Sequence, residues 1–203
     1  MPRMVADVTH RQTDRAVRSG AGAAKRALDI TLATLLLLLT LPLLLAATLL
    51  LACEGPGPIL VGRPKVGRGG TTFELLRFRT APPGGPDQAV SPIGRFLRST
   101  GIVTLPQLFN VLRGDLSMVG PHPLSPEVAE RRARIIAGYD RRSDARPGLT
   151  GCARLRQPQV ATLADARAEL RDDLDYVANP SAARDLRIMA DTLRNALARE
   201  GVR

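Results

Sequence analysis

The sequence predicts a mostly helical α+β protein in which a proline-kinked membrane helix precedes a small domain of short strands and amphipathic helices. Residues 30–53 form an apolar run without a charged side chain, in a chain otherwise rich in arginine. Short segments bounded by glycine and proline follow this run, as is typical of strands and turns. Later segments place apolar residues at helical spacing. We therefore expect three parts: residues 1–24 as a flexible basic tail, 25–53 as a membrane-embedded helix and 54–203 as a cytoplasmic domain.

The composition excludes several classes of protein. The chain has 203 residues and a formal net charge of +10, and Lys25 and Lys65 are its only lysines. Such a charge favours anionic partners. Because aromatic residues, which stack on bases, make up only 3% of the chain, a membrane surface is favoured over nucleic acid. Two cysteines and two distant histidines exclude a disulfide framework and a zinc site.

The apolar run is long enough to cross a bilayer. As a helix its 24 residues would rise about 36 Å, against about 30 Å for the hydrocarbon core. Pro42 lies near its middle and is expected to kink it, and Thr40 is expected to satisfy a carbonyl that the proline frees. Both flanks are basic, whereas a span is expected to carry that excess on one side only. These features favour a re-entrant hairpin over a straight span, with a buried helix of a soluble protein as a third alternative.

Local signals predict the elements of the domain. Thr104-Leu-Pro-Gln107 has the form of a capping box, so a helix is expected to begin at Thr104 and to end at Gly114. The last helix begins at the cap Ser181 and either packs on the core or lies on the membrane. The other expected elements are two strands on either side of Gly67–Gly70 and helices over 93–99 and 126–139.

The ordered motifs of the chain resemble those of the bacterial sugar transferases, the monotopic polyprenol-phosphate phosphoglycosyl transferases that begin surface-glycan and exopolysaccharide assembly. The resemblance covers about residues 25 to 195. The matching stretches are Lys25–Ile30, Gly55–Pro58, Lys65–Gly67, Leu76–Thr80, Ile93–Arg98, Leu105–Leu112, Gly114–Pro121 and Arg146–Gly151, with weaker matches at Asp175–Tyr176 and Asp185–Ile188.

The resemblance implies a fold, a reaction and a location. In the family the hydrophobic segment is a proline-kinked re-entrant helix in the bacterial cytoplasmic (inner) membrane, with the soluble domain on the cytoplasmic side. A UDP-sugar gives its phosphosugar to polyprenol phosphate, with Mg²⁺ assisting and UMP leaving. The phosphosugar is held covalently on an aspartate that has a glutamate beside it. An anionic nucleophile, a metal and phosphate-binding arginines are what attack on a diphosphate requires.

This chain departs from the family at the acidic pair. Val103 and Thr104 occupy those positions, and no carboxylate occurs between Asp87 and Asp115. Valine cannot attack a phosphate, and Thr104 is expected to serve as the cap of its helix. Asp115 is a possible substitute nucleophile or metal ligand, although a structural role in its loop is the simpler interpretation.

Two further departures concern basic residues. The loop where the family usually has Pro-Arg-Pro contains His122, and Arg63 stands where glutamine is common. The arginines that match the family are expected to bind phosphate or substrate, with a solvated or structural role as the alternative for each. They are Arg77, Arg79, Arg95, Arg98 and Arg146.

Three functions remain open on these grounds. The chain is a catalytically impaired member that binds nucleotide sugar, polyprenol phosphate or an active paralogue, or it is an active transferase with non-standard catalytic residues that uses Mg²⁺. The third alternative is a non-enzymatic, membrane-anchored basic adaptor. The missing pair favours the first. Membrane lipid is an expected partner in every case, and a paralogue or a second copy of the chain is a further one.

Overall fold

The computed structural model describes residues 2–84, 89–156 and 162–200, and 63% of it is helical. This confirms the mostly helical α+β class. The helices are α1 (Pro2–Glu54), α2 (Pro92–Ser99), α3 (Gln107–Arg113), α4 (Pro126–Ile135), α5 (Cys152–Arg156), α6 (Leu163–Ala178) and α7 (Ala182–Glu200). The strands are β1 (Leu60–Val66), β2 (Thr72–Phe78), β3 (Ser117–Val119) and β4 (Gly148–Thr150), and 3₁₀ turns form η1 (Arg68–Gly70), η2 (Ile102–Thr104) and η3 (Tyr139–Asp144).

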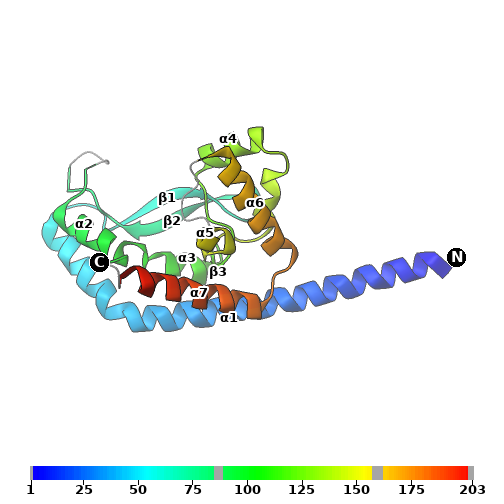
Figure 1. Cartoon of the computed structure of the whole chain (residues 1–203). Coiled ribbons are helices and arrows are strands. Elements are labelled where there is room, and N and C mark those ends of the chain that lie inside the picture. Colours follow the sequence, from blue (N-terminus) through cyan, green and yellow to red (C-terminus); the bar gives the residue numbers. More distant parts are fainter. Residues whose placement is uncertain (1, 85–88, 157–161, 201–203) are drawn as a thin grey trace.

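Helix α1 underlies the whole domain, and its ribbon changes direction in the light-blue section of Figure 1. Its part Gly22–Glu54 is long and apolar enough to cross a membrane, by length and composition. Residues 2–24, which the sequence predicts as a flexible tail, are helical and continue into this part. Pro42 lies inside the helix. The Thr40 hydroxyl donates to the carbonyl of Leu36 at 2.6 Å, one turn before it, and not to the carbonyl that a proline at 42 frees.

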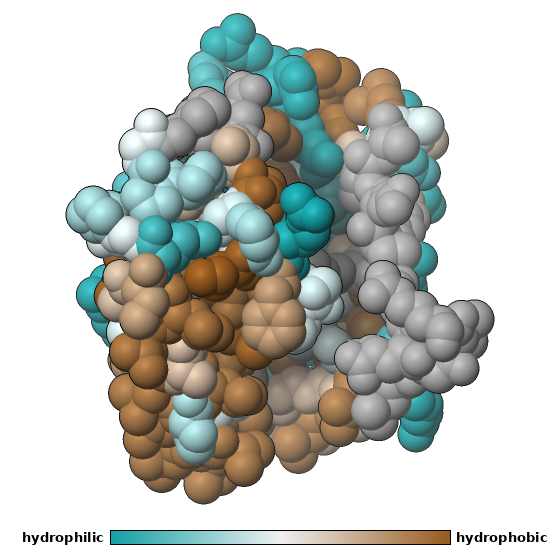
Figure 2. Space-filling view, turned by 90° about the vertical axis from the view of Figure 1, so that its left-hand side faces the viewer, coloured by the Kyte–Doolittle hydropathy of each residue, from teal (hydrophilic) through white to brown (hydrophobic). Residues whose placement is uncertain are grey.

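One side of α1 is covered by the domain and the other is open. Ala33, Leu44, Ala47 and Leu51 are buried against the domain. The other side is exposed and apolar. Figure 2 shows it at the C-terminal part of α1, where brown surface gathers over the lower part of the molecule. Exposed apolar residues of this helix and of α2 are Leu38, Leu39, Leu45, Leu49, Leu50 and Phe96.

The predicted hairpin is present. Strands β1 and β2 pair antiparallel, with Leu60 opposite Phe78 and Val66 opposite Thr72. The turn η1 joins them, and Gly69 there has φ of 67°, a left-handed conformation that glycine adopts without strain. The hairpin carries Arg63 and Arg77, which line a cavity described below.

The segment around the lost acidic pair folds differently from the prediction. Helix α2 has Ser91 as its N-cap, as expected for a helix over 93–99. The next helix, α3, begins at Gln107 with Pro106 as N-cap, so the predicted capping box at Thr104 is wrong. Thr104 instead closes the 3₁₀ turn η2, and its hydroxyl donates to the carbonyl of Gly101 at 2.9 Å. The predicted end of this helix is confirmed by Gly114, which has a left-handed φ of 96°.

The second half of the domain contains elements that the sequence analysis does not predict. Strands β3 and β4 form a short parallel pair. Helix α6 has a full capping box between Thr162 and Asp165, a signal that could have found it. Helix α4 ends at Ile135, four residues before the predicted end. Helix α7 begins after Ser181 as predicted and packs on the core through the buried Ile188.

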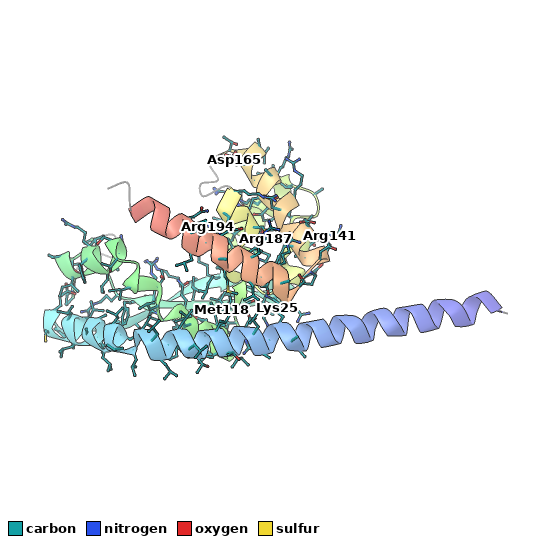
Figure 3. The ribbon with its side chains drawn as sticks, turned by 60° about the horizontal axis from the view of Figure 1, so that its bottom comes forward. Lys25, Met118, Arg141, Asp165, Arg187 and Arg194 are labelled. Carbon is teal, nitrogen blue, oxygen red and sulfur yellow. The ribbon has the colours of Figure 1, made fainter. Side chains whose placement is uncertain are left out.

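Three side chains near the middle of α1, just before its apolar section, fasten the helix to the domain. Lys25 donates to a carboxylate oxygen of Asp185 on α7 at 2.6 Å, and Arg26 donates to two carbonyls at the C-terminal end of α3. Asp29 accepts from the Ser117 hydroxyl and the Met118 amide on β3. Figure 3 shows Lys25 and Met118 close together where α7 lies beside α1. The matched motif Lys25–Ile30 therefore attaches α1 to the domain.

Candidate functional site

Thr104, at the second position of the acidic pair that the resemblance implies, lines a cavity of about 330 Å³, which we call the Thr104 cavity. Helix α1 contributes Leu36 and Thr40 to its wall, so the cavity lies directly on the apolar segment. The exposed Thr104 and the partly buried Gln107 supply a hydroxyl and an amide. The remaining lining residues are Leu75, Leu105, Leu108, His122, Pro123, Gly148 and Leu149.

Val103 does not line this cavity. Its side chain is 9% exposed and belongs to an apolar cluster that includes Leu44 and Leu51 of α1, with Phe78 and Leu97. Successive side chains of a 3₁₀ turn diverge by about 120°, so Val103 and its neighbour Thr104 have opposite surroundings. Val103, at the position where the resemblance implies the nucleophile, is thus part of the core.

His122 lies between two cavities. It lines the Thr104 cavity and also a second, mostly apolar cavity of about 330 Å³ below α4. Its backbone carbonyl accepts from a buried guanidinium, that of Arg142, at 3.2 Å. Two of the departures from the family pattern, Thr104 and His122, therefore meet in one cavity, which the sequence alone could not show.

A third cavity, of about 270 Å³, gathers predicted phosphate ligands, and we call it the arginine cavity. It is lined by Arg63 on β1, by Arg77 on β2 and by Arg79, which follows β2. Its other walls are the loop that follows α1 and the loop that follows β2. Arg98 joins it at the rim, because its guanidinium donates to the Thr80 hydroxyl at 2.7 Å and Thr80 lines the cavity.

The charges in this region are not balanced. Burial lowers the pKa of Arg77, and the neighbouring charges of Arg63 and Arg98 lower it further. Burial likewise lowers the pKa of Lys65, followed by the charges of Arg77 and Arg63. Within the described ranges, Arg63 and Arg77 form no ion pair with an acidic side chain. Such uncompensated positive charge attracts anions.

The two cavities are neighbours along β2. Leu75 lines the Thr104 cavity and Arg77 lines the arginine cavity. Side chains two apart on a strand share a face and are separated by about 7 Å. Arg63 lies opposite Leu75 in the hairpin register, on that same face.

Arg79 has a structural task as well. It is 6% exposed, and its guanidinium donates to the carbonyl of Leu51 at 3.0 Å and to that of Gly55 at 3.4 Å. It also lies 3.6 Å from Glu54. These contacts satisfy the free carbonyls at the C-terminal end of α1, and they hold the guanidinium in place beside the cavity.

Three predicted residues lie elsewhere. Arg95 is exposed on α2. Arg146 lines none of the three cavities described above; burial lowers its pKa, and the charges of Arg26 and Arg68 lower it further. Asp115 accepts from the side-chain amide of Asn110 at 3.1 Å, beyond the C-terminal end of α3, and lines none of the three cavities described above. Its geometry matches the structural role.

The residues present do not fit a protein-held Mg²⁺. The described residues contain no group of three or more His, Cys, Asp or Glu side chains that could hold a metal ion. The Thr104 cavity offers a hydroxyl, an amide and an imidazole, whereas Mg²⁺ is usually bound through one or two carboxylates. We therefore derive no step through a metal held by this chain.

A buried charge network below α4 was not expected from the sequence. Arg142 is 6% exposed and donates to Asp173 on α6 at 2.6 Å and to the Tyr139 hydroxyl at 3.0 Å. Glu169 lies 3.6 Å from Arg142. Burial raises the pKa of Asp173 to about 6, and the nearby Arg142 opposes the rise. No local signal marks these residues, because their partners come from different elements.

A fastened apolar helix, an α+β domain and a basic cavity define a membrane-associated protein with a site suited to anions. The chain belongs to the bacterial sugar transferase family, since the family's sequence model, described as "Bacterial sugar transferase", matches residues 20–199.

Named relatives agree with this membership. The chain is 40% identical over 185 residues to a UDP-glucose:undecaprenyl-phosphate glucose-1-phosphate transferase of Caulobacter vibrioides, covering 85% of this chain and 69% of that protein. It is 33% identical to a UDP-N-acetylgalactosamine-undecaprenyl-phosphate N-acetylgalactosaminephosphotransferase of Aeromonas hydrophila, covering 88% and 45%. It is 34% identical to the exopolysaccharide production protein PSS of Rhizobium leguminosarum, covering 86% and 96%. The chain thus spans less than half of some relatives and nearly all of others.

Proposed function

We propose that this chain is a membrane-bound sugar-transferase relative that binds a nucleotide diphosphate sugar and a polyprenol phosphate without forming the family's covalent phosphosugar intermediate. One observation carries the proposal: Val103 is packed in the apolar core, and the described residues place no carboxylate around the Thr104 cavity. A hydrocarbon side chain cannot supply the oxygen that attacks phosphorus. The site would therefore retain binding and lose the covalent step.

The relatives supply the substrate class of this proposal. Their names specify UDP-sugars as donors and undecaprenyl phosphate as acceptor. For this chain, the arginine cavity suits a diphosphate through charge-assisted hydrogen bonds. The Thr104 cavity, walled in part by α1, suits the head of a lipid phosphate. An active paralogue or a second copy of the chain would complete the chemistry.

The proposal includes a topology. We propose that α1 enters and leaves the bilayer on the cytoplasmic side, so that both cavities face the cytoplasm. The change of direction of α1 supports this arrangement, and so do basic residues on both flanks of the apolar segment. The contacts of Lys25 and those of Arg79 attach α1 to the same domain before and after its apolar section. A straight span would place these two attachments on opposite sides of the membrane.

The test is UMP release by the full chain in lipid nanodiscs, with Mg²⁺, polyprenol phosphate and a panel of UDP-sugars. An active family member serves as the positive control, and binding of the UDP-sugars is measured in parallel. We expect binding without release. Release above background that persists in repeated turnovers would overturn the proposal, and so would a lack of binding across the panel.

One observation favours a second candidate function, an active transferase. Thr104 and His122 line the same cavity, so a hydroxyl and a titratable base share the space that the family gives to its acidic pair. In that case an oxygen of the lipid phosphate attacks the sugar-bearing phosphorus directly, the anhydride bond breaks and UMP leaves with its electron pair. Release that is lost in His122→Ala but kept in Asp115→Asn would favour this candidate over one that uses Asp115.

A further inference from the structure

The arginine cavity holds more positive charge than its surroundings balance. Arg63 and Arg77 share one face of the hairpin, because Val61 pairs with Arg77 and Arg63 is two residues along β1. Arg79 is 6% exposed, and its Nε has no hydrogen-bond partner. Like charges held together repel one another. An anion in the cavity would remove that repulsion.

The arginine cavity also lies beside the end of the apolar section of α1. The loop Pro56–Pro58, which forms one wall, begins two residues after the end of α1. Gly57 in this loop has φ of 134°, and a Cβ there would meet the Arg79 guanidinium at 2.6 Å. The glycine thus lets the loop approach the buried arginine closely. Because the apolar run ends at Cys53, the cavity lies where α1 leaves its apolar section, the level of phosphate headgroups in a bilayer.

We propose that the arginine cavity is a phosphate-binding site distinct from the Thr104 cavity, in which Arg63 and Arg77 contact the anion and the fastened Arg79 forms the back wall. The phosphate belongs either to a lipid headgroup or to a soluble diphosphate. The inference deepens the proposed function and rests on it for the carrier of the phosphate. Its new content is the role of Arg63 and the separation of the two cavities.

The first experiment measures inorganic pyrophosphate binding to the full chain in phosphatidylcholine nanodiscs by calorimetry. The variants are Arg63→Gln, which keeps a polar side chain and removes the charge, and Arg171→Gln, a matched control at an exposed position on α6. Losing one charge-assisted hydrogen bond is expected to weaken binding about tenfold in Arg63→Gln, and the control should bind like the wild type. Equal binding by Arg63→Gln and the control, or no binding by the wild type, overturns the inference.

A second measurement separates a binding role from a packing role. Without added anion, Arg63→Gln is expected to unfold at a higher temperature than the wild type, because it relieves the repulsion with Arg77. Arg171→Gln should leave the unfolding temperature unchanged. A lower unfolding temperature for Arg63→Gln would show that the arginine stabilises the empty fold, which contradicts the proposal.

Two further arms identify the source of the phosphate and separate this inference from the proposed function. If phosphatidylglycerol in the nanodisc weakens pyrophosphate binding by the wild type but not by Arg63→Gln, the occupant is a lipid headgroup; equal binding in both lipids assigns it to a soluble diphosphate. If pyrophosphate binds as expected while no UDP-sugar binds, the inference stands and the proposed function fails. If a UDP-sugar binds equally to the wild type and Arg63→Gln, the function stands and the inference fails.

Discussion

Two adjacent residues, Val103 and Thr104, decide how the candidate site is understood. One is packed against α1 and the other is exposed at a cavity. The substitutions at the two positions therefore differ in kind. Threonine keeps a polar group in a polar position, whereas valine extends the apolar core. The second change is the harder to reverse, because Val103 packs in a cluster of hydrocarbon side chains.

Restoring an aspartate at this position is expected to cost stability. Val103→Asp buries a carboxyl group among apolar side chains, so the free energy of unfolding should fall by on the order of 2–3 kcal/mol. Thr104→Glu, at an exposed position, should change it by less than about 0.5 kcal/mol. Chemical denaturation of both variants in the same detergent checks this. Equal stabilities would contradict the packing described for Val103.

A second prediction at this scale concerns pH. The pKa of Asp173 is raised from 3.8 to about 6 by burial, so its proton is bound more tightly in the folded chain than in the unfolded one. The stability that this proton contributes is complete below pH 3.8 and is lost as the pH rises through about 6. The unfolding temperature of the wild type should therefore fall relative to that of Asp173→Asn between pH 4 and 7. Parallel curves for the two proteins would show that Asp173 does not titrate there.

At the scale of elements, α1 and α7 are joined by a buried polar cluster. Lys25 bonds to Asp185, which is 1% exposed, and Asp185 also accepts from the Tyr176 hydroxyl at 2.7 Å. The same hydroxyl lies 3.1 Å from the carbonyl of Val119 on β3. Tyr176 and Asp185 belong to the two stretches that match the family only weakly, Asp175–Tyr176 and Asp185–Ile188. These stretches thus supply partners for the first matching stretch, Lys25–Ile30.

Removing the lysine is expected to loosen α7. Lys25→Met leaves the buried Asp185 without its cation, which should lower the free energy of unfolding by on the order of 3 kcal/mol. Arg187→Met provides the control, since Arg187 is exposed on α7 (Figure 3). Limited proteolysis of α7 and thermal unfolding check the difference. Equal protection of α7 in the two variants would show that the buried pair does not hold the helices together.

Local signals in the sequence account for part of this architecture. The glycines between two β-rich runs predict the hairpin, and Gly114 predicts the end of α3, because both are decided by neighbouring residues. The start of α3 could not be predicted in this way, since Gly101 adopts a left-handed φ of 74° and the next residues close a 3₁₀ turn. The partners of Arg79, and the cavity shared by Thr104 and His122, depend on tertiary packing. Short motifs therefore identify candidate binding residues more easily than they show which cavity each residue lines.

At the scale of the whole molecule, the domain holds α1 at both ends of its apolar section. Lys25, Arg26 and Asp29 fasten its earlier part, and Arg79 fastens the carbonyls at its end. The exposed leucines lie between these two attachments. The apolar section is thus carried along one side of the domain, which is the arrangement that a re-entrant helix would need.

Cysteine labelling tests the topology. Ala23→Cys and Thr71→Cys, each at an exposed position, are made separately in a chain whose native Cys53 and Cys152 are replaced by serine. A membrane-impermeant maleimide should label both in inverted vesicles and neither in intact spheroplasts. Labelling of the two positions from opposite sides would establish a straight span and contradict the proposed hairpin.

The bond between Lys25 and Asp185 joins residues 160 positions apart. During synthesis the lysine leaves the ribosome, with the apolar helix that follows it, long before its partner is added. The bond that fastens α1 to α7 therefore forms only after the intervening part of the domain has been made. Until then, the acidic partner available to Lys25 is Asp29, on the same helix and 4.0 Å away, so the attachment of α1 to α7 is completed only after the domain between them.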